Sequence, residues 1–138
     1  MSVEFKDFRK IVLEKIHEQG ETFLEEAGGV MEAQVKKNTK VASLAGGQTK
    51  GSWTHVVNPE KMEVTIGSPN INALYEEFGT GIYALHGDGR KTKWVYRNPK
   101  DGKFYTTVGK KPRRALYNAY NTKKNAIIRE AKRRFGEL

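Results

Sequence analysis

The chain has 138 residues, the length of one ordinary domain, and its 37% hydrophobic and 30% charged residues are typical of a globular rather than a disordered protein. It has no cysteine, which excludes disulfides and thiolate metal sites, and no stretch of roughly 18 to 20 apolar residues that would span a bilayer. We therefore predict a single domain over 1–138, without a membrane partner and without a signal peptide over 1–20.

The formal net charge of +9 is spread unevenly along the chain. Residues 1–89 carry 9 Lys and Arg against 13 Asp and Glu, whereas residues 90–138 carry 16 against 3. Such an asymmetry indicates either that the basic end meets nucleic acid or that it meets the acidic end of a neighbouring subunit.

Apolar residues recur at helical spacing from residue 3 to about residue 40, at Phe5, Phe8, Val12, Ile16, Phe23, Ala27 and Val30. They predict an amphipathic helix over 1–40. As one straight piece this helix would reach roughly 57 Å, whereas a compact domain of this size is roughly 37 Å across. The helix must therefore either bend near Gly28-Gly29 or project beyond its own domain, where its apolar stripe would need a partner.

The remaining elements follow in chain order. The glycine-rich stretch 42–52 predicts a mobile loop, and "WTHVV" with "KMEVTIG" predicts an antiparallel hairpin. A short helix, "NALYEEF", is ended by a left-handed Gly79, and Ile82 and Tyr83 restart a strand. "KWVYR" and "KFYTT" predict a second hairpin around the turn "NPKDG", and Pro112 opens the last helix. The order predicts an α+β fold: a small antiparallel sheet of hairpins with the N-terminal and C-terminal helices packed on one face.

The stretch "YEEFGTGIYA" satisfies the dinucleotide-binding fingerprint in its loose form, through Gly79, Gly81 and Ala84. That fingerprint requires a strand before the glycines and a helix after them. Here the predicted order is the reverse. "GGQTKGS" also fails as a phosphate-binding loop, because Gly51 separates Lys50 from Ser52. We therefore predict no cofactor and no small-molecule substrate.

Side chains that could act in catalysis are few. Glu76 and Glu77 are adjacent, so on a helix they cannot both face one scissile bond. We expect one to be solvated and the other to reach a backbone amide or a basic residue of the second half. His17, His55 and His86 form neither a metal-binding spacing nor a catalytic triad. The sequence predicts no catalytic and no metal-binding residues.

The start of the basic half interleaves cations with aromatic residues: Arg90, Lys91, Lys93, Arg97, Lys100 and Lys103 alternate with Trp94, Tyr96, Phe104 and Tyr105. Such a mixture could stack bases and bind phosphates, as in a small basic nucleic-acid-binding protein or a ribonuclease or toxin-like module. Aromatic residues in strand alternation are more often the packing face of a sheet, however, and a run of charges is usually a solvated face. Both interpretations stay open at this point.

Three segments together resemble a phage protein family. "EAQVKKNTKV" followed by "QTKGSWTHVV" is similar to its first helix and strand, and "VTIGSPNINALYEEFGTG" is similar to its central signature. "WVYRNPKDGKFYTTVGKKPRRALYNAY" is similar to its closing hairpin and last helix. The chain resembles, over nearly its whole length, the siphophage tail-component family typified by gene product ten of a Hong Kong lambdoid phage. It departs from the family pattern at Thr49-Lys50-Gly51 and at Arg113-Arg114-Ala115.

The resemblance implies a non-enzymatic structural virion protein that acts in tail completion or head-tail joining. It implies a ring of copies between the connector and the tail tube, with connector and tail tube proteins as partners. The protein would be found in the virion, and in the host cytoplasm during assembly. The residues that carry the signature are Tyr75, Glu77, Phe78, Gly79, Thr80 and Gly81. Residues predicted to face DNA or a neighbouring subunit are Arg90, Lys91, Lys93, Lys110, Lys111, Arg113 and Arg114.

Overall fold

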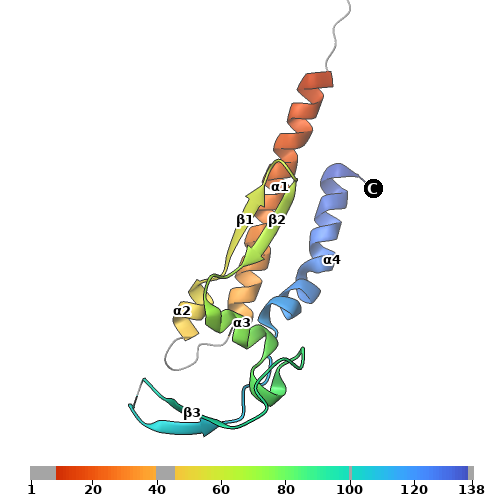
Figure 1. Cartoon of the computed structure of the whole chain (residues 1–138). Helices are drawn as coiled ribbons and strands as arrows, with labels where there is room; N and C mark the ends of the chain where they lie inside the picture. The colour runs from red at the N-terminus through yellow and green to blue at the C-terminus, as the bar shows by residue number, and fades with distance from the viewer. Residues whose placement is uncertain (1–8, 40–45, 100, 137–138) are drawn as a thin grey trace, which may run out of the picture.

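The computed structural model describes residues 9–39, 46–99 and 101–136. Its elements, in chain order, are helices α1 (Arg9–Asn38) and α2 (Gly46–Gly51), strands β1 (Thr54–Asn58) and β2 (Glu63–Gly67), helix α3 (Ile71–Phe78), the 3₁₀ turn η1 (Gly81–Tyr83), strands β3 (Trp94–Arg97) and β4 (Phe104–Thr107), and helix α4 (Ala115–Phe135). The two long helices lie along one another, the first hairpin packs on α1, and the second hairpin lies at one end of the molecule (Figure 1). The α+β prediction is confirmed.

Helix α1 is unbroken through Gly28 and Gly29. Its partner helix α4 ends beside Phe23, whose ring meets Phe135 edge-on with 5.7 Å between centroids. Residues 9–19 are exposed on every side, and Figure 1 shows the first turns of α1 extending past the end of α4. Of the two alternatives, bending or projection, the helix takes projection. The first eight residues and Lys40 of the predicted helix lie outside the described residues.

Two glycines of α1 let the first hairpin lie directly on the helix backbone. A Cβ at Gly28 would come within 2.6 Å of Cδ2 of His55 and 2.8 Å of Cγ2 of Val64. A Cβ at Gly20 would collide with the side chain of Met62 in the turn between β1 and β2. The cost of glycine in a helix, about 1 kcal/mol each, is therefore offset by close packing of the hairpin.

The core is small and lies between the C-terminal half of α1, helix α3 and the start of α4. Its buried members are Met31, Val35, Trp53, Ala73, Ala115 and Ala119, with Ile66, Leu116 and Ile127 packed against them. The Trp53 indole donates a hydrogen bond to Oγ1 of Thr39 at 3.0 Å, which satisfies its one polar atom. The predicted apolar stripe is only partly buried. Val12 and Ile16 are exposed because they lie on the turns of α1 before Phe23, where α4 ends.

The two hairpins form separate two-stranded antiparallel sheets rather than one sheet. In the first, Thr54 pairs with Gly67 and Asn58 with Glu63, and the sheet packs on α1. In the second, Trp94 pairs with Thr107 and Arg97 with Phe104. This second hairpin stands at the opposite end of the molecule from the start of α1 (Figure 1).

Three local predictions are wrong. Part of the predicted loop 42–52 is helical: Gly46–Gly51 forms α2, with Thr49 buried and its carbonyl bound by both N and Oγ of Ser52. Residues 42–45 lie outside the described residues. The stretch predicted to restart a strand at Ile82 and Tyr83 is the 3₁₀ turn η1.

The last helix does not open at Pro112. It begins at Ala115, because Arg114 has left-handed backbone angles, φ 56° and ψ 45°, which interrupt the helical path. Within the described ranges, no helix is both long and apolar enough to cross a membrane.

Candidate functional site

The signature segment begins at the end of α3. Asn70 caps the start of this helix, since its side chain accepts a hydrogen bond from the backbone N–H of Asn72 at 2.9 Å. At the other end, the N–H of Gly79 donates to the carbonyl of Tyr75 at 2.8 Å. Gly79 has the predicted positive φ, 74°, but its ψ of 175° is extended rather than left-handed helical. It ends the helix and sends the chain away from it.

The next residues are tied to a segment 30 positions later. The N–H of Thr80 donates to the carbonyl of Lys110 at 2.9 Å, and the N–H of Lys110 donates back to Oγ1 of Thr80 at 2.9 Å. The N–H of Ile82 then donates to the carbonyl of Val108 at 3.0 Å. The segments 80–82 and 108–110 therefore run against each other as a short bridge.

Glycines make this bridge possible. Gly81, at φ 62°, approaches Val108 so closely that a Cβ would overlap the Val108 carbonyl oxygen. Gly109 packs equally closely on the Thr80 carbonyl, and Gly89 on the Gly81 carbonyl. Three stretches of chain cross here with no space between their backbones. The close crossing of these chain segments accounts for the Gly-Thr-Gly pattern.

Glu77 lies buried, 6% exposed, between α3 and α4. Its Oε2 accepts the backbone N–H of Leu116 at 2.9 Å, and its Oε1 that of Tyr117 at 3.0 Å. These are N–H groups of the first turn of α4, which have no partner within their own helix. A carboxylate is also favoured there by the helix dipole. The prediction that one acid of the pair reaches a backbone amide of the second half is confirmed.

Glu76 is paired rather than solvated, which corrects the prediction for it. Its carboxylate contacts Nζ of Lys110 and lies 3.6 Å from Nε of Arg113. Its backbone carbonyl accepts the N–H of Arg113 at 2.7 Å. The two adjacent carboxylates therefore point to different targets, and both join α3 to the segment that leads into α4.

The seven basic residues predicted to face DNA or a subunit fall into two groups. Lys110, Arg113 and Arg114 are held by Glu76 and Glu77. Nε of Arg114 lies 3.9 Å from the Glu77 carboxylate, too far for a hydrogen bond, and this buried atom has no hydrogen-bond partner among the described residues. The guanidinium itself lies over the ring of Tyr117, 3.9 Å from its centroid.

The second group stays near the surface. Arg90 lies over the Trp94 ring at 5.7 Å and donates to Oγ1 of Thr92, and Lys111 lies over the ring of Tyr83 at 5.7 Å. Lys91 and Lys93 are exposed and make no ion pair with any described residue. These four make no ion pair with any described residue, whereas Lys110 and Arg113 are paired with Glu76 although each side chain is 41% exposed.

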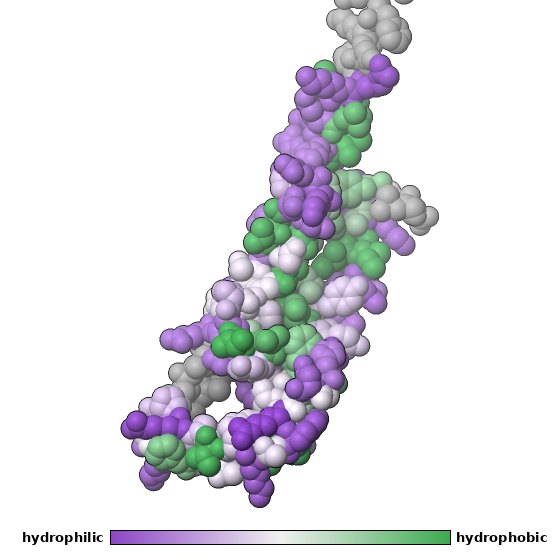
Figure 2. Space-filling model, viewed as in Figure 1, coloured by the Kyte–Doolittle hydropathy of each residue, from purple (hydrophilic) through white to green (hydrophobic). Residues whose placement is uncertain are grey.

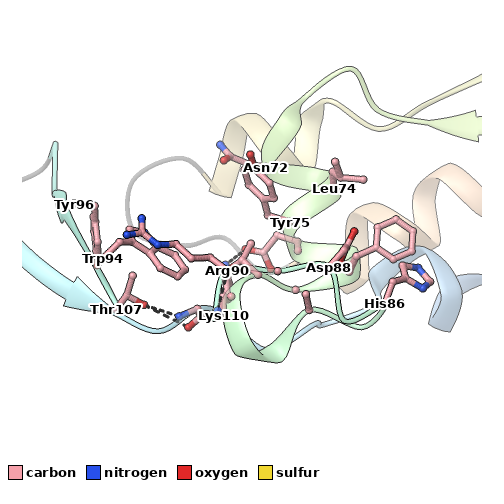
Figure 3. A pocket seen from close by; sticks show the side chains of 18 of the residues that line it. Asn72, Leu74, Tyr75, His86, Asp88, Arg90, Trp94, Tyr96, Thr107 and Lys110 are labelled. Carbon is pink, nitrogen blue, oxygen red and sulfur yellow. Dashed lines mark hydrogen bonds and ion pairs between the residues drawn. The ribbon is translucent and has the colours of Figure 1, made fainter. Parts of the chain in front are cut away.

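Residues 90–107, which comprise β3, β4, their turn and the lead-in, form what we call the arm. Its two faces differ. Tyr96 and Tyr105 are opposite one another and stack with 6.0 Å between ring centroids. This inner face, with Trp94, borders a groove of about 990 Å³ whose other wall carries Tyr75 of α3 (Figure 3). Aromatic rings and glycine backbone line part of the groove, together with polar and charged side chains that include Asp88, Arg90 and Lys110.

Several side chains in and near the groove already have partners within the chain. Arg90 extends across the groove and Lys110 lies at its floor, already paired with Glu76 (Figure 3). His86 packs on the ring of Phe78 with 5.2 Å between centroids. Among the described residues, no three His, Asp, Glu or Cys side chains lie together as metal ligands would.

A feature that the sequence reasoning missed lies where β1 meets α1. Nε2 of His55 lies 2.6 Å from Glu25 and Nδ1 lies 3.3 Å from Glu32. The hydrogen bond with Glu25, aided by that with Glu32 and opposed by burial, raises the pKa of His55. The sequence offers only one hint of this cluster, the spacing of Glu25 and Glu32 by two helical turns. It does not show which turn of the helix the strand with His55 packs against. The cluster holds the first hairpin on α1.

Comparison with known proteins does not add to these observations. No protein-family model matches the chain, and neither the curated proteins nor the solved structures include a significant match.

Proposed function

We propose that this chain is a structural assembly protein of a tailed phage or prophage that acts in tail completion or head-tail joining. It would assemble as a ring of copies between the connector and the tail tube. The proposal rests first on the resemblance of the signature Tyr75–Gly81 and of the flanking segments to the siphophage tail-component family. In keeping with a structural role, Glu77, Gly79, Thr80 and Gly81 all hold the fold together.

The observation that carries the proposal is the amount of apolar surface left open at the two ends of the molecule. Val12, Leu13 and Ile16 on the projecting part of α1 are each more than half exposed, as are Val95 and Phe104 on the arm. Figure 2 shows hydrophobic side chains open to solvent in both regions. A domain of this size rarely leaves such surface uncovered unless a partner covers it.

A gene deletion in the phage or prophage that encodes the chain tests this proposal. We expect filled heads and separate or aberrant tails in electron micrographs, with joined particles restored when the wild-type gene is supplied on a plasmid. Normal, infectious, joined virions in the deletion strain would refute it.

The second candidate function is a small basic nucleic-acid-binding module or ribonuclease. One observation favours it: Lys91 and Lys93 are free beside a groove lined by Trp94 and Tyr96. The purified protein would then cleave RNA without added metal, and the double substitution Lys91→Ala and Lys93→Ala would abolish cleavage. Such cleavage would overturn the structural proposal. The structural proposal predicts that neither the wild-type protein nor the double variant cleaves RNA.

A further inference from the structure

We propose that the outer face of the arm of one copy docks on the acidic face of the projecting part of α1 in the next copy, so that copies join head to tail. This rests on the proposed function only in that copies assemble. The surfaces themselves follow from the charges and exposure of the described residues.

The outer face of the arm exposes two apolar side chains beside the cation Arg97. Val95 and Phe104 are 62% and 70% exposed. Because opposite residues of paired strands share a face, Arg97 lies on the same side as Phe104, and Val95, two residues before Arg97, shares it. The arm carries six cations against one acid, Asp101, along its sequence.

The arm also has little support from its own chain. β3 and β4 pair mainly with each other, and neither packs extensively on a helix. An isolated two-stranded hairpin is at best marginally stable in water, so packing against a further surface would stabilise it. Apolar side chains on the outer face are the part of the arm that such a surface would cover.

The projecting part of α1 (residues 9–19) and the turn after it present the complementary pattern. Ile11, Glu14, Glu18 and Glu21 are spaced by three, four and three residues, which places them on one helix face. Ile11 is 55% exposed, and no described residue forms an ion pair with Glu14.

The other two acids of this face are held only weakly. Glu18 pairs with Lys15 at 3.7 Å, and both side chains are more than 70% exposed. Glu21 pairs with His17 at 3.0 Å, and both of these are also well exposed. Surface ion pairs of this kind contribute little free energy. They therefore do not prevent Glu18 and Glu21 from contacting a stronger cationic partner.

Charge and position together favour a second copy as the partner. Both surfaces expose apolar side chains, but the arm carries mainly cations, whereas the α1 face carries Glu14, Glu18 and Glu21 beside Lys10 and Lys15. Arm against arm would therefore place like charges together, and the acids of α1 offer the arm opposite charges. The two surfaces lie at opposite ends of the molecule (Figure 1), so one copy can use both at once. Such a head-to-tail contact generates a ring when its rotation closes.

Charge reversal tests the contact. One variant carries Lys93→Glu and Arg97→Glu on the arm; the other carries Glu14→Lys and Glu18→Lys on α1. All four side chains are exposed, and circular dichroism would check that both variants fold. Wild-type protein should self-associate in sedimentation velocity at low salt. Each variant alone should associate at least about 30-fold more weakly, because like charges then meet.

An equimolar mixture of the two variants should restore association. In the mixture, the acidic arm of one variant meets the basic α1 of the other, and the unmodified arm of the second meets the unmodified α1 of the first. A variant with Arg129→Glu and Lys132→Glu on α4 makes the same change in net charge as the arm variant and should behave as wild type. This mixing result is specific to a contact between these two surfaces.

Three outcomes would overturn the docking proposal: wild-type protein that stays monomeric up to about 1 mM, an arm variant that associates as wild type does, or a mixture that does not recover. If the copies associate equally well with and without these substitutions, they use a different contact surface. The proposed role in virion assembly would not be contradicted by that result. Conversely, normal virions from the gene deletion would refute that role even where the purified copies associate as predicted.

Discussion

The carboxylate of Glu77 caps helix α4 at Leu116, with 2.9 Å between Oε2 and the backbone nitrogen. The residue at the N-cap position of α4, Arg114, has no acceptor atom in its side chain and makes no capping hydrogen bond. The cap is therefore supplied from a different helix, α3. This arrangement makes the start of α4 depend on the docking of α3, and it joins the middle of the chain to its last helix.

Replacing Glu77 should destabilise the fold more than replacing any surface acid. Glu77→Ala removes the acceptor of two N–H groups and the counter-charge of the half-buried Arg114, so we expect a loss of about 3 kcal/mol in unfolding free energy. Glu77→Gln should lose less, because its amide oxygen can still accept one bond. Urea denaturation followed by circular dichroism measures both. Glu60→Gln, on an exposed turn, is the control, and an equal effect at Glu60 would contradict the capping role.

The chain crossing at Gly81 predicts a large difference between two glycines of similar φ. Gly81 and Gly87 have φ of 62° and 70°, but only Gly81 has backbone atoms where a Cβ would stand. Gly87→Ala should cost about 1 kcal/mol for the backbone conformation alone. Gly81→Ala should cost at least about 3 kcal/mol, or leave the protein unfolded, because Val108 must also move. Similar unfolding midpoints for the two variants would show that the segments do not cross as closely as described.

The His55 cluster predicts a pH dependence of stability. Both ring nitrogens face carboxylates, and only the imidazolium can donate to Glu25 and Glu32 together. The hydrogen bond to Glu25 raises the pKa of His55 above 6.5 in the folded protein. The contribution of His55 to the stability of the fold is therefore complete below pH 6.5. It is lost as the pH rises through the folded-state pKa of His55. The stabilisation by this cluster should fall on the alkaline side.

Carboxylate titration sets the acid limit of the same cluster. Burial alone would raise the pKa of Glu32, but its hydrogen bonds with Lys36 and His55 outweigh this and lower it below 4.5. The contribution of Glu32 is therefore present above pH 4.5 and disappears as the pH falls through its folded-state pKa.

Urea unfolding midpoints between pH 5 and pH 9 would measure the His55 effect. In His55→Gln we expect a loss of about 1 kcal/mol at pH 6 and a flatter dependence between pH 6 and pH 8. His17→Gln, which removes an exposed histidine paired with Glu21, should keep the wild-type profile. A His55→Gln profile parallel to the wild-type profile would rule out the cluster as the source.

Local patterns were sufficient to predict the two long helices, α3 and both hairpins, but not α2, the 3₁₀ turn η1 or how the elements assemble. The spacing of apolar residues in α1, the alternation in both hairpins and the turn at Asn98 to Gly102 are all local signals, and each element forms. The separation of the two hairpins depends on which surfaces α1 and α3 leave open, which is a property of packing between distant segments. A single sheet was therefore predicted where there are two.

The same distinction holds at the candidate site. Adjacency of Glu76 and Glu77 was enough to predict that they diverge, because neighbours on a helix point in different directions. It could not identify Lys110 as the partner of Glu76, since that contact depends on the bridge between segments 80–82 and 108–110. The late start of α4 was missed for a similar reason: Pro112 suits a first helical turn, but the left-handed Arg114 is set by its tertiary surroundings.

Removing residues 1–19 should leave the stability of the domain almost unchanged. All described residues in this range are exposed, and α4 first meets α1 through Phe23 and Glu26. The unfolding free energy should change by less than about 1 kcal/mol, because little buried area is lost. Self-association should disappear with Glu14 and Glu18. A longer deletion, of residues 1–27, also removes the contacts of Phe23 and Ala27, and it should lower the unfolding free energy several times more. Equal losses of unfolding free energy from the two deletions would show that the projecting turns support the fold rather than bind a partner.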